Sequence, residues 1–222
     1  MTLTAPPQLP TQLSVLMRDG SRTEHEAAEG SNFMEELLAG RLSPQGYLTY
    51  LLRLREVYDA MEQTAQTLMD DPIAGVMIDP ALDRLDAIDA DIAYWSERIG
   101  TKVVAGESSP AVAAYVARLR ESTTWGGLFV AHHYTRYLGD LSGGQAIGKI
   151  LTRAYDLDGR GVAFYDFPEI EKLKLYKDEY RASLDSLPLD AEEKLRLLDE
   201  VKVAFNLNQA LFEELTAELL PS

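Results

Sequence analysis

Apolar residues recur along this chain mostly every three or four positions, which is the period of a helix that buries one face. No run alternates apolar and polar residues between Asn-Gly or Asp-Gly turns, as a paired strand would. Helix starts are marked by a capping residue before proline at Ser43-Pro44, Asp79-Pro80 and Ser109-Pro110. Asp190, with Glu193 three residues later, has the form of a capping box. Together these signals predict an all-α fold.

Helix-start signals and loops rich in Gly, Pro, Asp and Ser divide the chain into eight predicted helices. These helices span residues 9–29, 32–39, 44–69, 80–100, 110–121, 124–155, 168–186 and 190–219. There is no repeat of roughly 20–50 residues and no long biased linker. Residues 1–222 are therefore expected to form a single domain, with residues 1–9 disordered.

Composition narrows the class of protein. Hydrophobic residues make up 46% of the 222 residues, enough for a sizeable core, yet no apolar run reaches the roughly 18 residues of a membrane span. The first residues lack the pattern of a secretory signal, so a soluble cytoplasmic protein without a membrane anchor is expected. The absence of cysteine excludes disulfides, iron–sulfur clusters and thiolate ligands. A formal charge of −15 argues against nucleic-acid binding.

The segment Gly139–Gly144 departs from a plain amphipathic helix. It places three glycines and a serine within six positions, and each glycine costs a helix about 0.5–1 kcal/mol relative to alanine. This energetic cost predicts that the helix bends, or that a flat group approaches its backbone closely. Gly139 and Gly143 share a face, and small residues on one face often allow two helices to pack closely. Asp140 beside them favours a ligand instead, because a carboxylate is a poor helix contact unless Arg136 neutralises it.

The histidines can be examined separately, since there are only three. Arg18, Arg22, His25 and Glu29 fall near one helical face, so Glu29 could orient the imidazole of His25 as a metal ligand. The same spacing fits a half-buried histidine in a surface salt-bridge cluster, and spacing alone favours that interpretation. His132 and His133 share a helix with the glycines and could not face them across a flat cofactor. They are predicted to be structural or solvent-facing.

The contiguous segment Tyr134–Gln145 resembles the signature of the haem (heme) oxygenase family. The stretches His25–Met34, Tyr176–Arg181 and Phe205–Leu215 are similar to further parts of that family, so the resemblance covers roughly residues 10–219. His133 is not part of the usual signature. Arg18 stands where lysine is common, and the hydrophobic tail of animal members is missing, as in the soluble bacterial type.

The resemblance implies that haem b lies between a proximal and a distal helix, as both substrate and prosthetic group. His25 would be the axial iron ligand, and Asp140 would order a water network supported by Arg136 and Tyr58. The propionate-binding cations would be Arg18, Arg22, Lys177 and Arg181, which would fix the in-plane orientation of haem and hence the meso bridge that is cut. The other expected haem contacts are Glu29, Met34, Tyr134, Gly139, Ser142, Gly143, Gly144, Phe205 and Asn208.

The implied reaction is an O2- and electron-dependent cleavage of haem to biliverdin, CO and Fe2+, for iron acquisition or haem catabolism. A neutral histidine ligand does not push strongly toward O–O cleavage, so the distal side would direct the chemistry. No flavin or nicotinamide motif is present, which implies an external electron donor, either a ferredoxin or an NAD(P)H-dependent reductase. A hypothetical docking patch consists of Lys149, Arg153, Lys172, Lys174 and Lys177. A solvated charged face explains these residues equally well.

Two other functions are compatible with such a helical fold. A non-catalytic haem carrier or sensor would use the same ligand, but it would have no need of the carboxylate of Asp140. A related fold acting on another small molecule, such as a thiamin-salvage hydrolase, typically relies on a cysteine, which this chain lacks. Both features favour the oxygenase.

Overall fold

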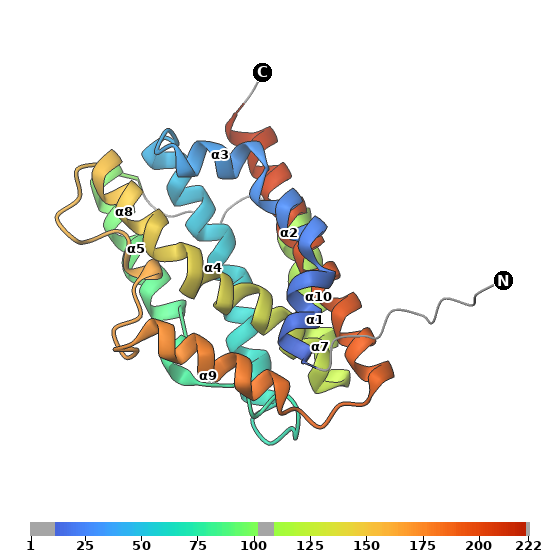
Figure 1. The fold of residues 1–222 in the computed structure, drawn as a ribbon. Coiled ribbons are helices and arrows are strands. Elements are labelled where there is room, and N and C mark those ends of the chain that lie inside the picture. The colour runs from blue at the N-terminus through green and yellow to red at the C-terminus, as the bar shows by residue number, and fades with distance from the viewer. Residues whose placement is uncertain (1–11, 102–108, 221–222) are drawn as a thin grey trace.

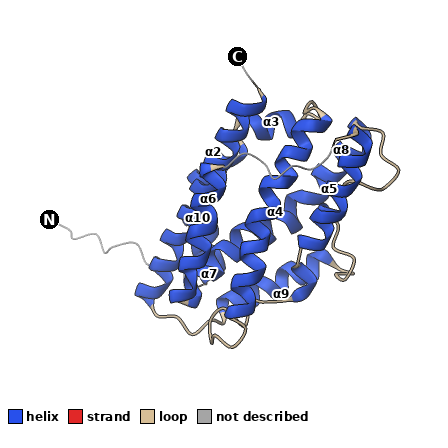
Figure 2. Ribbon diagram, turned by 180° about the vertical axis from the view of Figure 1, so that it is seen from behind, coloured by secondary structure: helices blue, strands red, loops and turns tan. Residues whose placement is uncertain are grey.

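The computed structural model describes residues 12–101 and 109–220, so the expected disorder of residues 1–9 lies outside the described residues. Within these ranges the secondary structure is helical and contains no strand, which confirms the all-α prediction (Figures 1 and 2). The α-helices are α1 (Leu13–Gly20), α2 (Arg22–Glu29), α3 (Asn32–Leu38), α4 (Pro44–Thr67), α5 (Leu85–Ile99), α6 (Pro110–Glu121), α7 (Gly126–His133), α8 (Gln145–Ala154), α9 (Leu173–Asp185) and α10 (Ala191–Leu219). None of the described helices has the length and apolar character needed to cross a bilayer.

The predicted caps explain where several helices begin. The hydroxyl of Ser43 accepts a hydrogen bond from Gly46 N at 3.0 Å, and the hydroxyl of Ser109 accepts one from Val112 N at the same distance. Asp190 and Glu193 form the predicted capping box at the start of α10. Each cap satisfies amide groups that the first helical turn leaves unpaired.

Helices α4 and α10 organise the core. α4 packs against α5 and α6, and its buried side chains include Tyr47, Leu51 and Tyr58. α10 packs against α2, α3, α6 and α7, so it joins the first helices to the middle of the chain. This arrangement leaves α2 and the glycine-rich segment on the same side of α10.

The predicted helix over residues 9–29 is wrong at Ser21. The backbone of Ser21 leaves helical geometry, with φ −114° and ψ 15°, and its hydroxyl donates to Met17 O at 2.7 Å. This break separates α1 from α2.

Two other helices begin at residues that differ from the prediction. A 3₁₀ turn at Pro80–Leu82 precedes α5, and α9 begins at Leu173 rather than at residue 168.

The predicted helix over residues 124–155 forms one continuous path that includes two π-helical segments. α7 leads into η3 (Tyr134–Leu138) and η4 (Asp140–Gly144) before α8 begins at Gln145. We call the stretch from Tyr134 to Gly144 the glycine segment. In Figure 1 it runs, olive to yellow, obliquely across the bundle between α2 and α9. The wider π turns take the place of the predicted bend, and such turns are frequent at functional sites.

Candidate active site

A slot lies between α2 and the glycine segment, with α10 as its back wall. Both α2 and η3 pack against α10, which sets the width of the opening. The slot consists of an inner cavity of about 140 Å³ and an outer cavity of about 330 Å³. The two cavities share His25, Thr135, Gly139 and Phe205 as lining residues. Small-molecule sites commonly have volumes of roughly 300–1,000 Å³, and the two cavities joined as one slot offer space of that order.

The face of the glycine segment toward the slot is bare. Gly139 and Gly143 are exposed, and apart from the adjacent backbone of its own helix, a Cβ built on either would meet no described atom within 4 Å. No neighbouring helix covers them, so close helix packing does not explain these two glycines. Gly144 differs, because it is buried and its Cβ would lie 3.1 Å from Cδ1 of Tyr165.

Beside this bare face, four side chains from α4, α10 and the glycine segment form one hydrogen-bond network. The Nη1 of Arg136 donates to Asn208 Oδ1 at 2.6 Å, while its Nε and Nη2 donate to the hydroxyl of Tyr58 at 3.1 and 3.0 Å. That hydroxyl donates in turn to Asp140 Oδ2. Tyr58 comes from α4 and Asn208 from α10, so the fold itself brings the network together.

Burial determines the proton affinities in this network. It raises the pKa of the Asp140 carboxyl, and Arg136 and Tyr58 only partly offset the effect. Burial also raises the pKa of Tyr58 well above its ordinary value, so this hydroxyl stays protonated and can donate. Burial acts to lower the pKa of Arg136, but Tyr58 and Asp140 outweigh it and the guanidinium stays charged. The site therefore combines a fixed cation with a carboxyl that holds a proton more readily than a free aspartate does.

His25 occupies the opposite side of the slot. Its side chain is 48% exposed, and its Nδ1 lies 3.5 Å from Oε2 of Glu29. The ring meets Phe205 edge-on, with 5.3 Å between centroids. With Nδ1 directed at Glu29, Nε2 is the nitrogen that remains for a ligand in the slot. An imidazole below a bare backbone face fits a planar group with a metal at its centre.

The mouth of the slot is rich in cations. Arg18 and Arg22 line the outer cavity with Tyr134 and Ser142, and both arginines are exposed beside Asp19. Lys177 Nζ donates to the hydroxyl of Ser142 at 3.4 Å from the α9 side.

Most of the predicted site residues meet at this slot. Those that line it are Arg18, Arg22, His25, Glu29, Met34, Tyr134, Arg136, Gly139, Asp140, Ser142, Gly143, Gly144, Phe205 and Asn208. Tyr58 does not line the slot but donates a hydrogen bond to Asp140, which does. Lys177 and Arg181 lie on α9, beside the mouth.

Sequence reasoning missed five larger side chains of the inner cavity: Tyr50, Ile147, Phe164, Tyr165 and Phe212. Phe212 could have been found, because it is seven residues after Phe205 and shares its face of α10. Phe164 and Tyr165 form an aromatic pair in the 3₁₀ turn Ala163–Tyr165. Asp91 fixes that pair by accepting hydrogen bonds from the amides of Ala163 and Phe164, both at 2.9 Å.

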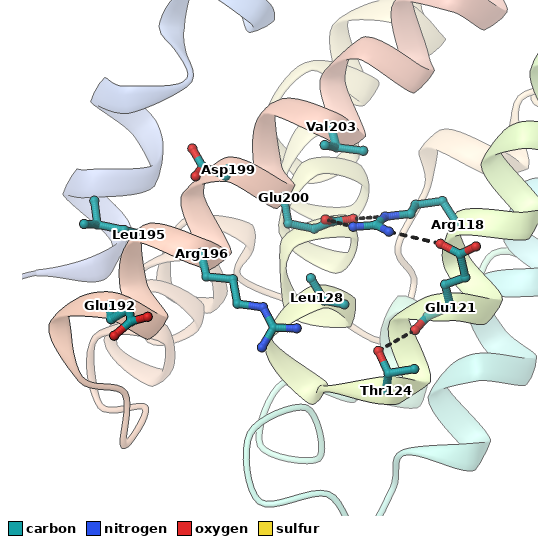
Figure 3. A pocket seen from close by; sticks show the side chains of 10 residues that line it. All are labelled: Arg118, Glu121, Thr124, Leu128, Glu192, Leu195, Arg196, Asp199, Glu200 and Val203. Carbon is teal, nitrogen blue, oxygen red and sulfur yellow. Dashed lines mark hydrogen bonds and ion pairs between the residues drawn. The ribbon is translucent and has the colours of Figure 1, made fainter.

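His132 and His133 are buried, so the solvent-facing alternative for them is wrong. His132 Nε2 lies 2.9 Å from Oε1 of Glu200, which also pairs with Arg118 in a surface hollow between α6 and α10 (Figure 3). Burial acts to raise the pKa of Glu200, but His132 and Arg118 hold it at about 2. His133 Nδ1 lies 2.8 Å from the hydroxyl of Tyr180 on α9. Both histidines therefore attach the region before the glycine segment to other helices.

The sequence matches the family described as "Heme oxygenase" over residues 11–214. It is 36% identical to "Heme oxygenase 1" of Homo sapiens over 214 residues, which cover 95% of this chain and 74% of the human protein. It is also 36% identical to "Heme oxygenase 1" of Nostoc sp. over 217 residues, covering 95% and 88% of the two chains.

Solved structures agree with the sequence relatives. The haem oxygenase of Leptospira interrogans superposes with a TM-score of 0.86 at 37% identity, covering 91% of this chain and 99% of that one. The haem complex of heme oxygenase-1 from the cyanobacterium Synechocystis gives a TM-score of 0.85 at 36% identity, covering 94% of each chain. The chain belongs to the haem oxygenase family.

Proposed function

We propose that this protein binds haem in the slot and cleaves it to biliverdin, CO and Fe2+, using O2 and electrons from a separate donor. One observation supports this most directly: the imidazole of His25 lies across the slot from the bare face of Gly139 and Gly143, with Asp140 at its side. The slot draws on α2 and α10, helices from opposite ends of the chain. We therefore propose that residues 1–222 act as a single domain.

Haem would be held by three kinds of contact. Nε2 of His25 would bind the iron, with Glu29 fixing the tautomer through Nδ1. Apolar walls from Met34 and Phe205 would cover the ring. The propionates would meet the cations of the mouth, which are Arg18, Arg22, Lys177 and Arg181.

The distal residues would control protons and space. Haem iron and O2 supply the oxidative chemistry, while Gly139 and Gly143 leave room above the ring. Asp140 would hold a water molecule and supply a proton through it, since burial favours its protonated form. Arg136 and Tyr58 would fix the orientation of that carboxyl. Proton delivery would then be confined to one side of the ring.

Electrons would come from a ferredoxin or an NAD(P)H-dependent reductase. The basic residues proposed for docking lie on two helices. Lys149 and Arg153 are on α8, while Lys172, Lys174 and Lys177 lie at the start of α9 or within it. Basic residues stand out in a chain with a formal charge of −15. A negatively charged donor would be steered to them, with an association rate that falls as salt is added.

The test is an anaerobic haem titration followed by addition of reductant and oxygen. The Soret band should first sharpen with a stoichiometry of one, and then disappear as a verdin absorbance forms and CO is released. Haem that binds and persists under these conditions would favour a carrier or sensor. A protein that binds no haem would refute the assignment of the slot.

A further inference from the structure

His133 joins the glycine segment to α9. It is the last residue of α7, and its side chain is buried among the rings of Phe129, Tyr137 and Tyr180. The ring of Tyr180 stacks on the imidazole, with 5.7 Å between centroids and 6° between planes. The hydroxyl of Tyr180 also meets Nδ1 of His133 at 2.8 Å.

The imidazole of His133 acts as a neutral hydrogen-bonding group. Burial lowers its pKa to about 3, so it carries no charge near neutral pH. A buried polar group is costly unless it is paired, and the Tyr180 hydroxyl provides that pair. The contact is therefore a fixed connection between two elements rather than a pH switch.

Among the described residues, few polar contacts hold α9 in its position. Near its start, Tyr176 donates to Asp79 Oδ2 at 2.7 Å, and near its end Asp185 accepts hydrogen bonds from Ser14. The contact of Tyr180 with His133 lies between these two, in the middle of the helix. Without it, the middle of α9 would be held by packing and by the long 3.4 Å contact of Lys177 with Ser142.

The middle of α9 carries the two cations assigned to the slot mouth. Lys177 precedes Tyr180 by three residues and Arg181 follows it directly, so a shift of Tyr180 moves both charges. Tyr134, next to His133, lines the mouth from the opposite side. Arg181 and Arg18 both act electrostatically on the Tyr134 hydroxyl, which places these cations around one point of the mouth.

We propose that His133 is a positioning residue: through its hydrogen bond to Tyr180 it sets Lys177 and Arg181 at the mouth, and so fixes the in-plane orientation of haem. The proposal rests on the proposed function, because it takes haem as the ligand. A porphyrin held at its iron and between apolar walls can still rotate in its own plane. Charges at the mouth oppose that rotation by holding the propionates, and the orientation decides which meso bridge faces the reacting oxygen.

The experiment compares His133→Phe, Tyr180→Phe and the double variant with the wild-type protein. Tyr180→Phe keeps the stacked ring and removes only the hydroxyl. Tyr155→Phe is the matched control, because it removes a tyrosine hydroxyl that donates to Leu42 O at 2.6 Å, away from α9. His133→Asn keeps a polar group near the position of Nδ1 and should behave more like the wild type than His133→Phe does.

Two readouts are used. The first is the ratio of haem orientations, from the paramagnetically shifted methyl resonances of the ferric cyanide complex, and it needs no turnover. The second is the distribution of verdin isomers. In Tyr180→Phe the minor orientation should increase about fivefold, the change that about 1 kcal/mol produces in a two-state equilibrium. The double variant should match the single variants, and Tyr155→Phe should match the wild type.

The proposal is overturned if Tyr180→Phe folds, binds haem and keeps the wild-type ratio of orientations. Absence of verdin from the wild-type protein would instead contradict the proposed function. In that case the resonances of bound haem still test the role of His133. A shift in orientation with unchanged total haem consumption is the result that a merely structural role would not give.

Discussion

The two sides of the slot are built differently. On the α2 side, His25 is half exposed, and the one polar contact of its side chain within the described residues is with Glu29, at 3.5 Å. On the opposite side, Arg136, Tyr58 and Asn208 are buried and joined by hydrogen bonds of 2.6 to 3.1 Å, and the hydroxyl of Tyr58 donates in turn to Asp140. The residues around Asp140 are held by contacts within the protein, whereas the imidazole of His25 is held only loosely. Substitutions on the two sides should therefore separate haem ligation from folding.

The largest effect is expected from His25→Ala. Turnover to verdin should be abolished, because the iron loses its protein ligand, and added imidazole should restore part of it. Since the side chain is half exposed, the free energy of unfolding of the apoprotein should change by no more than about 0.5 kcal/mol. Verdin formation and a urea titration measure the two quantities. Full turnover without imidazole would remove His25 from the site.

A smaller loss is expected from Asp140→Ala. Haem should still bind, but verdin formation should fall roughly 100-fold, the usual order for a lost proton donor. Peroxidase-like oxidation of an added phenol should rise in its place. Asp140→Asn keeps a partner for the hydroxyl of Tyr58 without the acidic proton, so it separates proton supply from network geometry. An unchanged verdin yield in both variants would mean that another group supplies the proton.

The bare face can be tested with two neighbouring glycines. In Gly143→Ala the new methyl enters the slot, so haem affinity should fall about tenfold, equal to about 1.4 kcal/mol. The apoprotein should become more stable by up to about 1 kcal/mol, since alanine favours a helix.

Gly144→Ala is the matched control for Gly143→Ala. Its methyl would press on Tyr165 at 3.1 Å, so the apoprotein should lose roughly 1 kcal/mol by overpacking. Haem titrations and urea titrations of both variants measure the contrast. Equal behaviour of the two variants would contradict the distinction between an open and a packed glycine.

The parts of the fold that the sequence predicted are those governed by local chemistry. The caps at Ser43, Ser109 and Asp190 depend on residues within three positions, and all were confirmed. The break at Ser21 was not predicted, because the polar residues around it fit either one helix or two. The path of the glycine segment was predicted, but its two π turns have no local signal in the sequence.

In the site, too, residues close together in sequence were predicted from their spacing, whereas some that only the fold brings together were not. Gly139, Asp140 and Arg136 lie within one segment, and their chemistry was visible in its spacing. Tyr165 reaches the slot only because Asp91, more than seventy residues earlier, caps its turn. The contact of His133 with Tyr180 likewise joins positions 47 residues apart, so periodicity along the chain could not reveal it.

The last effect concerns the pH dependence of stability that the buried histidines produce. Burial lowers the pKa of His133 from 6.5 to about 3, so between these values the unfolded chain binds a proton that the folded chain does not. The free energy of unfolding is therefore unaffected by this titration above about pH 6.5. As the pH falls from there toward 3, it decreases by about 1.4 kcal/mol per pH unit. Burial also lowers the pKa of His132, so this residue likewise makes the free energy of unfolding decrease as the pH falls. Urea titrations between pH 6 and 4.5 should thus show a shallower dependence in His133→Phe than in the wild type. The window stops at pH 4.5 because Glu200, with its pKa held at about 2, begins to lose its own contribution below that pH. An identical slope in the two proteins would mean that His133 is solvated or charged in the folded state, and the connection to α9 would then lose its physical basis.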